Sequence, residues 1–438
     1  MTSAVTAPPE KRKSPHFTRA LQHRNYRLFF SGQTVSLVGT WITRIATSWL
    51  VYRLSGSVFL LGIVGFFGQI PTLLLAPFAG VLVDRWNRHR ILVVTQVLSM
   101  LQSVGLAVLT FAGVITVVDV LLLQLAQGII NAFDTPARQA FVVQMVEDRS
   151  DLPNAIALNS SMVNASRIIG PSIGGVLIAA VGEGWCFTAD AISYVAVIAS
   201  LLAMQIERPG VSRRDTRVWE ELRAGFRYVT RFTPARDSLL LLALVGTMGM
   251  PYTVLMPAIA SQILHGGPHT LGYLMTASGV GALAGAFYLA SRRSVLGLGR
   301  AIVIASITFG FGLVAFSFSH VLWLSLVLLP FVGGGMMVEM ASTNTILQTI
   351  VDDSMRGRVM AFYTMAFLGT APLGSLIAGF AADRIGPMRT ILVGGAACIT
   401  AGIVFGFRLP KLRAQVRPIY IERGILVAAE IEGGTKSL

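Results

Sequence analysis

Six charged side chains lie inside long apolar runs of this sequence, where a charge is costly unless it has a partner or a task. They are Arg44, Asp134, Arg138, Arg167, Asp190 and Glu339. An arginine in such a position can bind an anion or pair with a carboxylate. A carboxyl group among apolar neighbours can load and release protons near neutral pH, because burial disfavours its charged form. These residues are therefore candidates for a substrate cavity and its coupling groups.

The first apolar run carries a polar stripe made of Ser36, Thr40, Thr43, Arg44 and Thr47. This spacing puts the five side chains on one helix face, turned away from lipid. Arg44 either faces a cavity, where it binds substrate or pairs with a carboxylate, or is a structural arginine satisfied by carbonyls and waters. Arg167 is a second mid-span cation. Together the two arginines would make the N-terminal part of a cavity electropositive.

The acids allow two interpretations. Asp134 and Arg138 are one helical turn apart and can simply pair with each other. The alternative is proton coupling, because Glu339 aligns with Asp134 when the two halves of the chain are compared. Glu339 is the better candidate for coupling, since it has no obvious partner nearby in the sequence, and Asp190 is a third candidate.

Composition shows which elements must position these residues. The chain has 438 residues, of which 54% are hydrophobic and 13% charged, whereas a soluble domain carries about 25% charged residues. A membrane-spanning helix needs about 20 apolar residues. The sequence therefore predicts an all-α membrane protein with twelve spans, at 33–54, 58–82, 91–113, 118–141, 154–181, 186–205, 237–264, 270–291, 301–318, 321–345, 359–382 and 389–407.

The basic residues alternate between connections. One set of connections holds nearly all of them, and the opposite set holds only Arg53, Arg384 and Arg389. The positive-inside rule then places both termini in the cytoplasm. The net charge of +14 is explained by this topology, and no nucleic-acid partner is expected.

The chain divides into five parts. We expect an N-terminal tail (1–32), a six-helix half (33–206), a linker (207–236), a second half (237–408) and a C-terminal tail (409–438). The linker contains an amphipathic helical pattern with Trp219, Leu222 and Phe226 on one side. The halves repeat, as in many transporters: Leu37-Val38-Gly39-Thr40 recurs as Leu244-Val245-Gly246-Thr247, and Gly80, Asp134 and Pro171 align with Gly285, Glu339 and Pro372.

The connection between the second and third runs reads Gly80-Val81-Leu82-Val83-Asp84-Arg85-Trp86-Asn87-Arg88-His89-Arg90. It resembles the Gly-x-x-x-Asp-Arg-x-Gly-Arg-Arg/Lys motif of the major facilitator superfamily of transporters. Asn87 replaces the second glycine, and asparagine tolerates a left-handed conformation. The resemblance implies a twelve-helix major facilitator bundle around a central cavity, gated through Gly80, Asp84, Arg85, Arg88 and Arg90. The alternative is an ordinary arginine-rich cytoplasmic loop.

The fifth run contains Gly170-Pro171-Ser172-Ile173-Gly174-Gly175, which is similar to a motif of drug–proton antiporters that is thought to favour export. Proline breaks the backbone ladder and glycine permits a bend or close packing, so generic packing of a kinked helix is the alternative. With Pro136–Phe141 and the stretch 352–379, which contains Pro372, the chain resembles enterobactin-exporter-like and macrolide-efflux-like bacterial proteins. It departs from the antiporter pattern at Gln124, where an arginine is usual.

These patterns predict a secondary transporter in the bacterial inner membrane, a monomer that uses the proton gradient and no bound cofactor. It would export a small amphipathic or anionic compound, a drug or siderophore, by rocking its halves around a midplane site. An importer or uniporter with the same fold, or a non-transporting sensor, are the alternatives. An enzyme is not expected: the six histidines lie in tails or loops, and Cys186 and Cys398 read as buried small hydrophobes.

Overall fold

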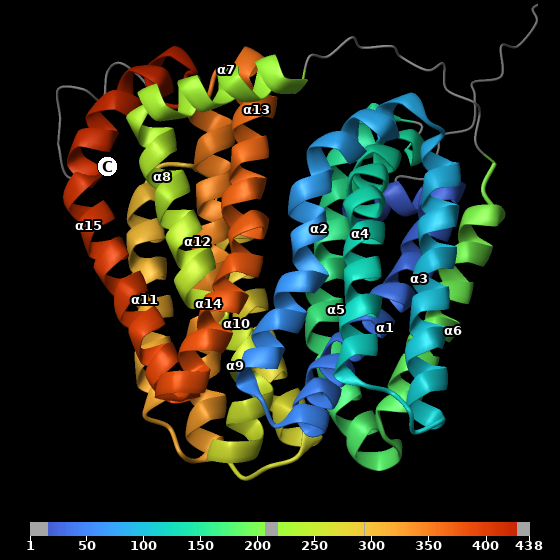
Figure 1. Cartoon of the computed structure of the whole chain (residues 1–438). Helices are drawn as coiled ribbons and strands as arrows, with labels where there is room; N and C mark the ends of the chain where they lie inside the picture. The colour runs from blue at the N-terminus through green and yellow to red at the C-terminus, as the bar shows by residue number, and fades with distance from the viewer. Residues whose placement is uncertain (1–15, 147, 206–217, 293, 427–438) are drawn as a thin grey trace, which may run out of the picture.

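The computed structural model describes residues 16–146, 148–205, 218–292 and 294–426, and its helices form two bundles that stand side by side (Figure 1). Within these ranges the chain forms helices and connecting turns and no strand. The predicted all-α architecture in two halves is confirmed.

The first bundle contains six long helices. They are α1 (Arg24–Ser55), α2 (Val58–Arg85), α3 (Arg88–Phe111), α4 (Val117–Met145), α5 (Leu152–Val181) and α6 (Glu183–Leu202). Short 3-10 helices precede α1 and α5, namely η1 (His16–Gln22) and η2 (Arg149–Asp151). The predicted boundary at residue 33 lies inside α1, which begins at Arg24.

The second bundle contains helices of less regular geometry. They are α8 (Thr233–Leu244), η3 (Val245–Gly249), α9 (Tyr252–Ala258), η4 (Ile259–Ile263), α10 (Pro268–Ser291), α11 (Leu298–Ser317), α12 (Leu322–Ile350), α13 (Asp353–Thr364), η5 (Met365–Gly369), α14 (Thr370–Ile385) and α15 (Pro387–Glu422). The segments η3, η4 and η5 are π-helical turns, which typically mark functional or strained positions. The α15 helix continues beyond the predicted end of this half at residue 408.

Eleven helical segments of the described chain are long and apolar enough to cross a membrane. The α1 helix is not among them, although it has 32 residues and packs against α5 and α6 inside the first bundle. Its arginines and its polar stripe lower its apolar character. The count reaches the predicted twelve spans only if α1 is included on the basis of its length and its position in the bundle.

Capping side chains set several helix ends. Ser57 begins α2 by accepting a hydrogen bond from the backbone N–H of Leu60 at 3.3 Å, and Asn87 begins α3 by accepting one from Arg90 at 3.2 Å. Asn87 has φ −69° and ψ 109°, so the expected left-handed conformation at this residue is wrong. A short amide side chain suits this position because it satisfies a free N–H of the first helical turn.

The predicted amphipathic helix of the linker is present as α7 (Val218–Arg231), which lies across one end of the second bundle (Figure 1). Its buried residues include Gly225 and Val229, while Phe226 is 60% exposed and its ring is tilted against that of Phe362, with centroids 6.2 Å apart. The exposed ring of Phe226 is compatible with the predicted amphipathic helix, and α7 packs on α13 through Gly225, where a Cβ would stand 3.0 Å from Arg358 and from Phe362. The side chains of Trp219 and Leu222 lie outside the described part of the structure.

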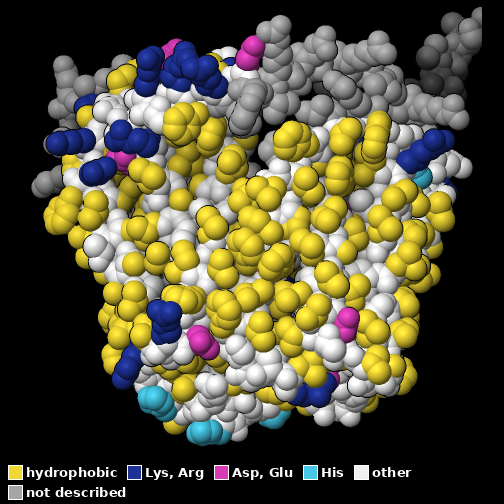
Figure 2. Space-filling view, viewed as in Figure 1, with side chains coloured by type: hydrophobic (Ala, Val, Ile, Leu, Met, Phe, Trp, Pro, Cys, Tyr) yellow, Lys and Arg dark blue, Asp and Glu magenta, His cyan; other side chains and the backbone are white. Residues whose placement is uncertain are grey.

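Charge separates the two ends of the molecule. In Figure 2 the larger groups of lysine and arginine side chains gather at the end where α7 lies, and hydrophobic side chains cover the face between the two ends. We call the α7 end the arginine-rich end.

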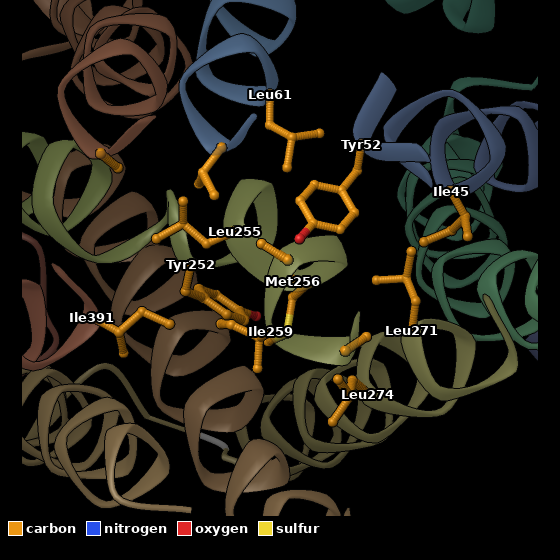
Figure 3. Packing of buried hydrophobic residues seen from close by; sticks show 14 of the residues in the cluster. Ile45, Tyr52, Leu61, Tyr252, Leu255, Met256, Ile259, Leu271, Leu274 and Ile391 are labelled. Atoms are coloured by element: carbon orange, nitrogen blue, oxygen red, sulfur yellow. The ribbon is translucent and has the colours of Figure 1, made fainter. Parts of the chain in front are cut away.

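The two bundles touch near the opposite end. A Cβ built on Gly175 of α5 would stand 2.8 Å from the Cα of Gly272 in α10, and one built on Gly62 of α2 would stand 2.8 Å from the Cα of Gly379 in α14. Only glycine permits such close helix crossings. One buried apolar cluster joins the bundles there, with Tyr52 and Leu61 of the first packed near Leu255, Met256 and Leu271 of the second (Figure 3).

Candidate functional site

Arg44 and Arg167 come together on one aromatic ring. The guanidinium carbon of Arg44 lies 5.1 Å from the ring centroid of Trp41, and that of Arg167 lies 5.9 Å from the same centroid. Both distances are typical of cation–π contacts. The structure therefore joins the two predicted cations into one site, with Trp41 between them.

Neither guanidinium group has a hydrogen bond or an ion pair within the described residues. Arg44 is exposed and Arg167 is half-buried, so both remain accessible inside the molecule. The two positive charges lie close enough to repel each other. Two like charges on one ring repel each other, and an anion between them would relieve that repulsion.

The sequence analysis did not predict Trp41 as a site residue. It precedes Arg44 by three residues, which puts the indole and the guanidinium on neighbouring positions of one helix face. That spacing is the signal that could have identified it. The partner Arg167 comes from α5, and no local sequence pattern indicates that contact.

The Gly-Pro segment of α5 positions this site. A Cβ on Gly170 would stand 2.3 Å from the Cβ of Trp41, and one on Gly174 would stand 3.3 Å from the Cα of Ile42. These glycines let α5 lie directly against α1, so that Arg167 reaches the ring. Pro171 is buried inside α5, which stays one continuous helix.

The same segment also contacts the other bundle. Besides the approach of Gly175 to Gly272, the hydroxyl groups of Ser172 and Thr276 are hydrogen-bonded at 2.6 Å. The backbone of Arg167 packs beside Gly279 of α10. The arginine pair therefore lies next to the α5–α10 contact between the two halves.

The second half has a similar glycine contact next to Pro372, the sequence counterpart of Pro171. A Cβ on Gly374 of α14 would stand 2.5 Å from the backbone oxygen of Thr247 and 2.9 Å from Pro251. Pro251 is the sequence counterpart of Arg44, so this second contact has no arginine at the equivalent position. The glycine packing is symmetric, whereas the charge belongs to one half only.

The polar stripe of α1 divides between two environments. Ser36, Thr43 and Thr47 are buried, while Thr40 and Arg44 are exposed. The hydroxyl of Thr40 lies 3.5 Å from that of Tyr194 in α6. The stripe thus faces the interior of the bundle, and only part of it reaches the accessible site.

Asp134 is fully engaged by its neighbours. It pairs with Arg138 at 3.2 Å, and its second oxygen accepts hydrogen bonds from Thr95 at 2.9 Å and from Gln96 at 2.8 Å. Its carboxylate is therefore turned toward α3 within the first bundle. Of the two sequence interpretations, the pairing of Asp134 with Arg138 is the one present in the structure.

Glu339 has the opposite environment. Its exposed fraction is 1%, and neither carboxyl oxygen has a hydrogen-bond partner among the described residues. The buried hydroxyls of Ser342 and Thr343 on the same helix also have none there. A buried carboxyl group without a cation is stable only when it holds its proton. The two aligned acids therefore differ in environment: Asp134 has an ion pair and two hydrogen bonds, and Glu339 has none among the described residues.

Asp190 is buried at 2% exposure but satisfied by hydroxyl groups. Ser103 of α3 donates to it at 2.8 Å and Ser193 at 3.4 Å. It links α3 to α6 and has no ion pair with a described arginine or lysine, so it forms part of the polar packing of the first bundle.

The predicted gating loop is described only in part. The side chains of Asp84 and Arg85, and the surroundings of Gly80, lie outside the described part of the structure. Arg88 is half-buried and Arg90 is exposed in the first turn of α3. His89, which the sequence prediction passed over, contacts the backbone oxygen of Leu201 at 2.8 Å, and so fastens this loop to the end of α6.

Two helical bundles related by an internal repeat, with an accessible polar site beside their contact, are the architecture expected for the major facilitator superfamily. The family model described as "Transmembrane secretion effector", which belongs to this superfamily, matches residues 17–432. The chain therefore belongs to that family. The fold and its relatives are those of multi-pass membrane transporters of small molecules, not of enzymes.

Three named relatives align over most of their lengths. The chain is 27% identical to the staphyloferrin A transporter of Staphylococcus aureus (89% of this chain, 98% of the relative). It is 29% identical to the multidrug efflux pump Tap of Mycolicibacterium fortuitum (86% and 93%). It is 25% identical to macrolide efflux protein A of Streptococcus pyogenes (87% and 96%). These relatives confirm the predicted branch.

Solved structures confirm the fold. A peptide transporter of the POT type superposes with a TM-score of 0.72 over 89% of this chain and 94% of that one, at 11% identity. At this level of identity the likeness concerns the arrangement of helices alone.

Proposed function

We propose that this transporter exports an anionic, amphipathic small molecule from a bacterial cytoplasm in exchange for protons. The observation that carries the proposal is the pair formed by Arg44 and Arg167 on Trp41. A carboxylate between the two guanidinium groups would receive charge-assisted hydrogen bonds from both, and the apolar part of the substrate would lie against the indole.

The proposed direction rests on the two ends of the molecule. The positive-inside rule puts the arginine-rich end, with both termini, in the cytoplasm. The glycine contacts at Gly62–Gly379 and Gly175–Gly272 close the halves near the opposite end. A substrate would then reach Arg44 from the cytoplasmic side. The names of two relatives, a multidrug efflux pump and a macrolide efflux protein, support export.

The proposed coupling group is Glu339. It would take a proton when the halves open outward and release it when they open inward, without a bound cofactor. Asp134 is less suited, because Arg138, Thr95 and Gln96 stabilise its charged form. The chain would act as a monomer, since the whole proposed path lies within one polypeptide.

The test is a cellular accumulation assay in a bacterial strain that lacks its own exporters. Cells with and without this chain would receive carboxylate siderophores, macrolides and neutral dyes, before and after a protonophore. Proton-driven export predicts lower accumulation of the anionic compounds, reversed by the protonophore. Raised accumulation would show import and contradict the direction.

The variants Arg44→Gln and Arg167→Gln should lose export of anionic compounds. The control is Arg389→Gln, which removes an exposed arginine in the first turn of α15 and should leave export unchanged. Equal export of anionic compounds by all three variants would show that Arg44 and Arg167 do not bind the substrate.

A further inference from the structure

A pocket opens at the arginine-rich end of the second bundle, between α8, α12, α15 and the turn before α11. It has about 650 Å³ of empty space when its open mouth is included. Most of its lining is apolar, including Leu296, Ile346, Phe405, Leu409, Leu412 and Val416. It lies in the second bundle, apart from the arginine pair on Trp41.

Two arginines line the same pocket. Arg413 and Arg417 stand one turn apart on α15, followed by Tyr420. One terminal guanidinium nitrogen of Arg413 is shielded from water and has no hydrogen-bond partner among the described residues. A shielded donor without an acceptor is unfavourable. Arg300 lies close enough to Arg413 to repel it, which adds to the need for an anion.

The protein does not supply that anion from the described surroundings. No acidic side chain belongs to the described lining of the pocket. Asp237, next to the lining residue Ser238, is already paired with Arg236 at 3.1 Å and with Arg408 at 3.2 Å. The pocket therefore combines an apolar interior with positive charge that remains to be neutralised.

We propose that this pocket binds one anionic phospholipid from the adjoining membrane leaflet. An acyl chain would lie along Phe405, Leu409 and Leu412, and the phosphate would contact Arg413 and Arg417. Arginine binds phosphate in a bidentate manner, and basic pockets between helices at a membrane surface take lipid headgroups. The site depends only on the fold and not on the proposed transport function.

The experiment measures thermal unfolding of the purified full-length protein in detergent. Phosphatidylglycerol and phosphatidylcholine with identical acyl chains are added in parallel. Phosphatidylglycerol should raise Tm by several degrees more than phosphatidylcholine. The double variant Arg413→Gln/Arg417→Gln should lose this difference. The matched control is Arg227→Gln/Arg231→Gln, which removes two exposed arginines of α7 at the same end and should keep it.

A second variant tests the apolar part of the site and covers the case in which the arginine variant fails to fold. Leu409→Trp fills the pocket and leaves both arginines in place, so it should also lose the response to phosphatidylglycerol. The proposal predicts that inorganic phosphate alone has no comparable effect.

Four results would overturn the proposal. Equal Tm shifts with both lipids would show that binding does not require the anionic headgroup. A Tm shift of the same size with inorganic phosphate would show that binding does not require the acyl chain. Equal losses in the two double arginine variants would indicate diffuse attraction to the surface. A response seen only in Glu430→Gln/Glu432→Gln, which neutralises acids beyond the described residues, would identify the C-terminal tail as the occupant.

Discussion

Arg44 on α1 and Arg167 on α5 stack on the same indole ring, at 5.1 Å and 5.9 Å from its centroid, without an acidic partner among the described residues. In the proposed function, the anionic substrate is the group that balances these two charges. This relationship makes Trp41 as important as the arginines, because the ring is what both of them contact.

Trp41→Ala should weaken binding of anionic substrates, because both arginines lose the surface that orients them. Cation–π contacts contribute about 0.5–2 kcal/mol, so KM for an anionic substrate should rise by about 2- to 30-fold. Trp41→Phe should retain part of the affinity. Transport kinetics in proteoliposomes check this, and an unchanged KM in Trp41→Ala would contradict the role of the ring.

Gly170→Ala should destabilise the first bundle by about 1–3 kcal/mol, the usual cost of overpacking, because the new Cβ would stand 2.3 Å from that of Trp41. The matched control is Gly357→Ala in α13, where a Cβ would meet no atom within 4 Å. That change should be neutral or stabilising, since alanine favours helix over glycine. Thermal unfolding of the two variants in the same detergent measures the contrast.

Gly175→Leu should open the contact between the halves. Its side chain would collide with the backbone of Gly272 at 2.8 Å, so α5 and α10 would separate near the arginine-poor end. Spin labels placed on α2 and α14 at that end should show longer distances than in the unmodified protein. A distance distribution that does not change would mean that this crossing does not hold the halves together.

Glu339→Gln should remove the dependence of transport on the proton gradient, because glutamine keeps the shape of a protonated carboxyl group and cannot release a proton. Binding of substrate should persist, since Glu339 lies on α12 and the arginine pair lies on α1 and α5. Counterflow exchange and gradient-driven uptake, measured on the same vesicles, separate the two effects. Undiminished gradient-driven transport would exclude Glu339 as the coupling group.

Exchanging the partners in Asp134→Arg/Arg138→Asp should fail to restore the activity lost in either single variant. A simple ion pair would tolerate the exchange. The acid at position 134, however, also accepts hydrogen bonds from Thr95 and Gln96, and an arginine has no acceptor to offer them. Recovery of activity in the exchanged variant would show that these two hydrogen bonds contribute little.

The environments of the candidate acids depend on contacts outside the local sequence. Asp134 and Glu339 align in the repeat, yet Asp134 has three partners, Thr95 and Gln96 of α3 and Arg138 of α4, while Glu339 has no hydrogen-bond partner among the described residues. Sequence alignment reports equivalent positions and carries no information on the side chains of neighbouring helices. The periodic pattern of α7 likewise predicts an apolar face but does not show which residues of the helix contact α13.

The sequence by itself determined the helical membrane fold, the two halves and most helix positions, because long apolar runs and their periodicity are properties of single segments. It also indicated Arg44, Arg167 and Glu339, since charges in apolar runs are visible one at a time. Only the tertiary structure decided that the two arginines share Trp41, that Gly170 faces α1 while Gly175 faces α10, and that Glu339 has no hydrogen-bond partner among the described residues. These are contacts between helices distant in the chain, and they depend on packing that no single segment specifies.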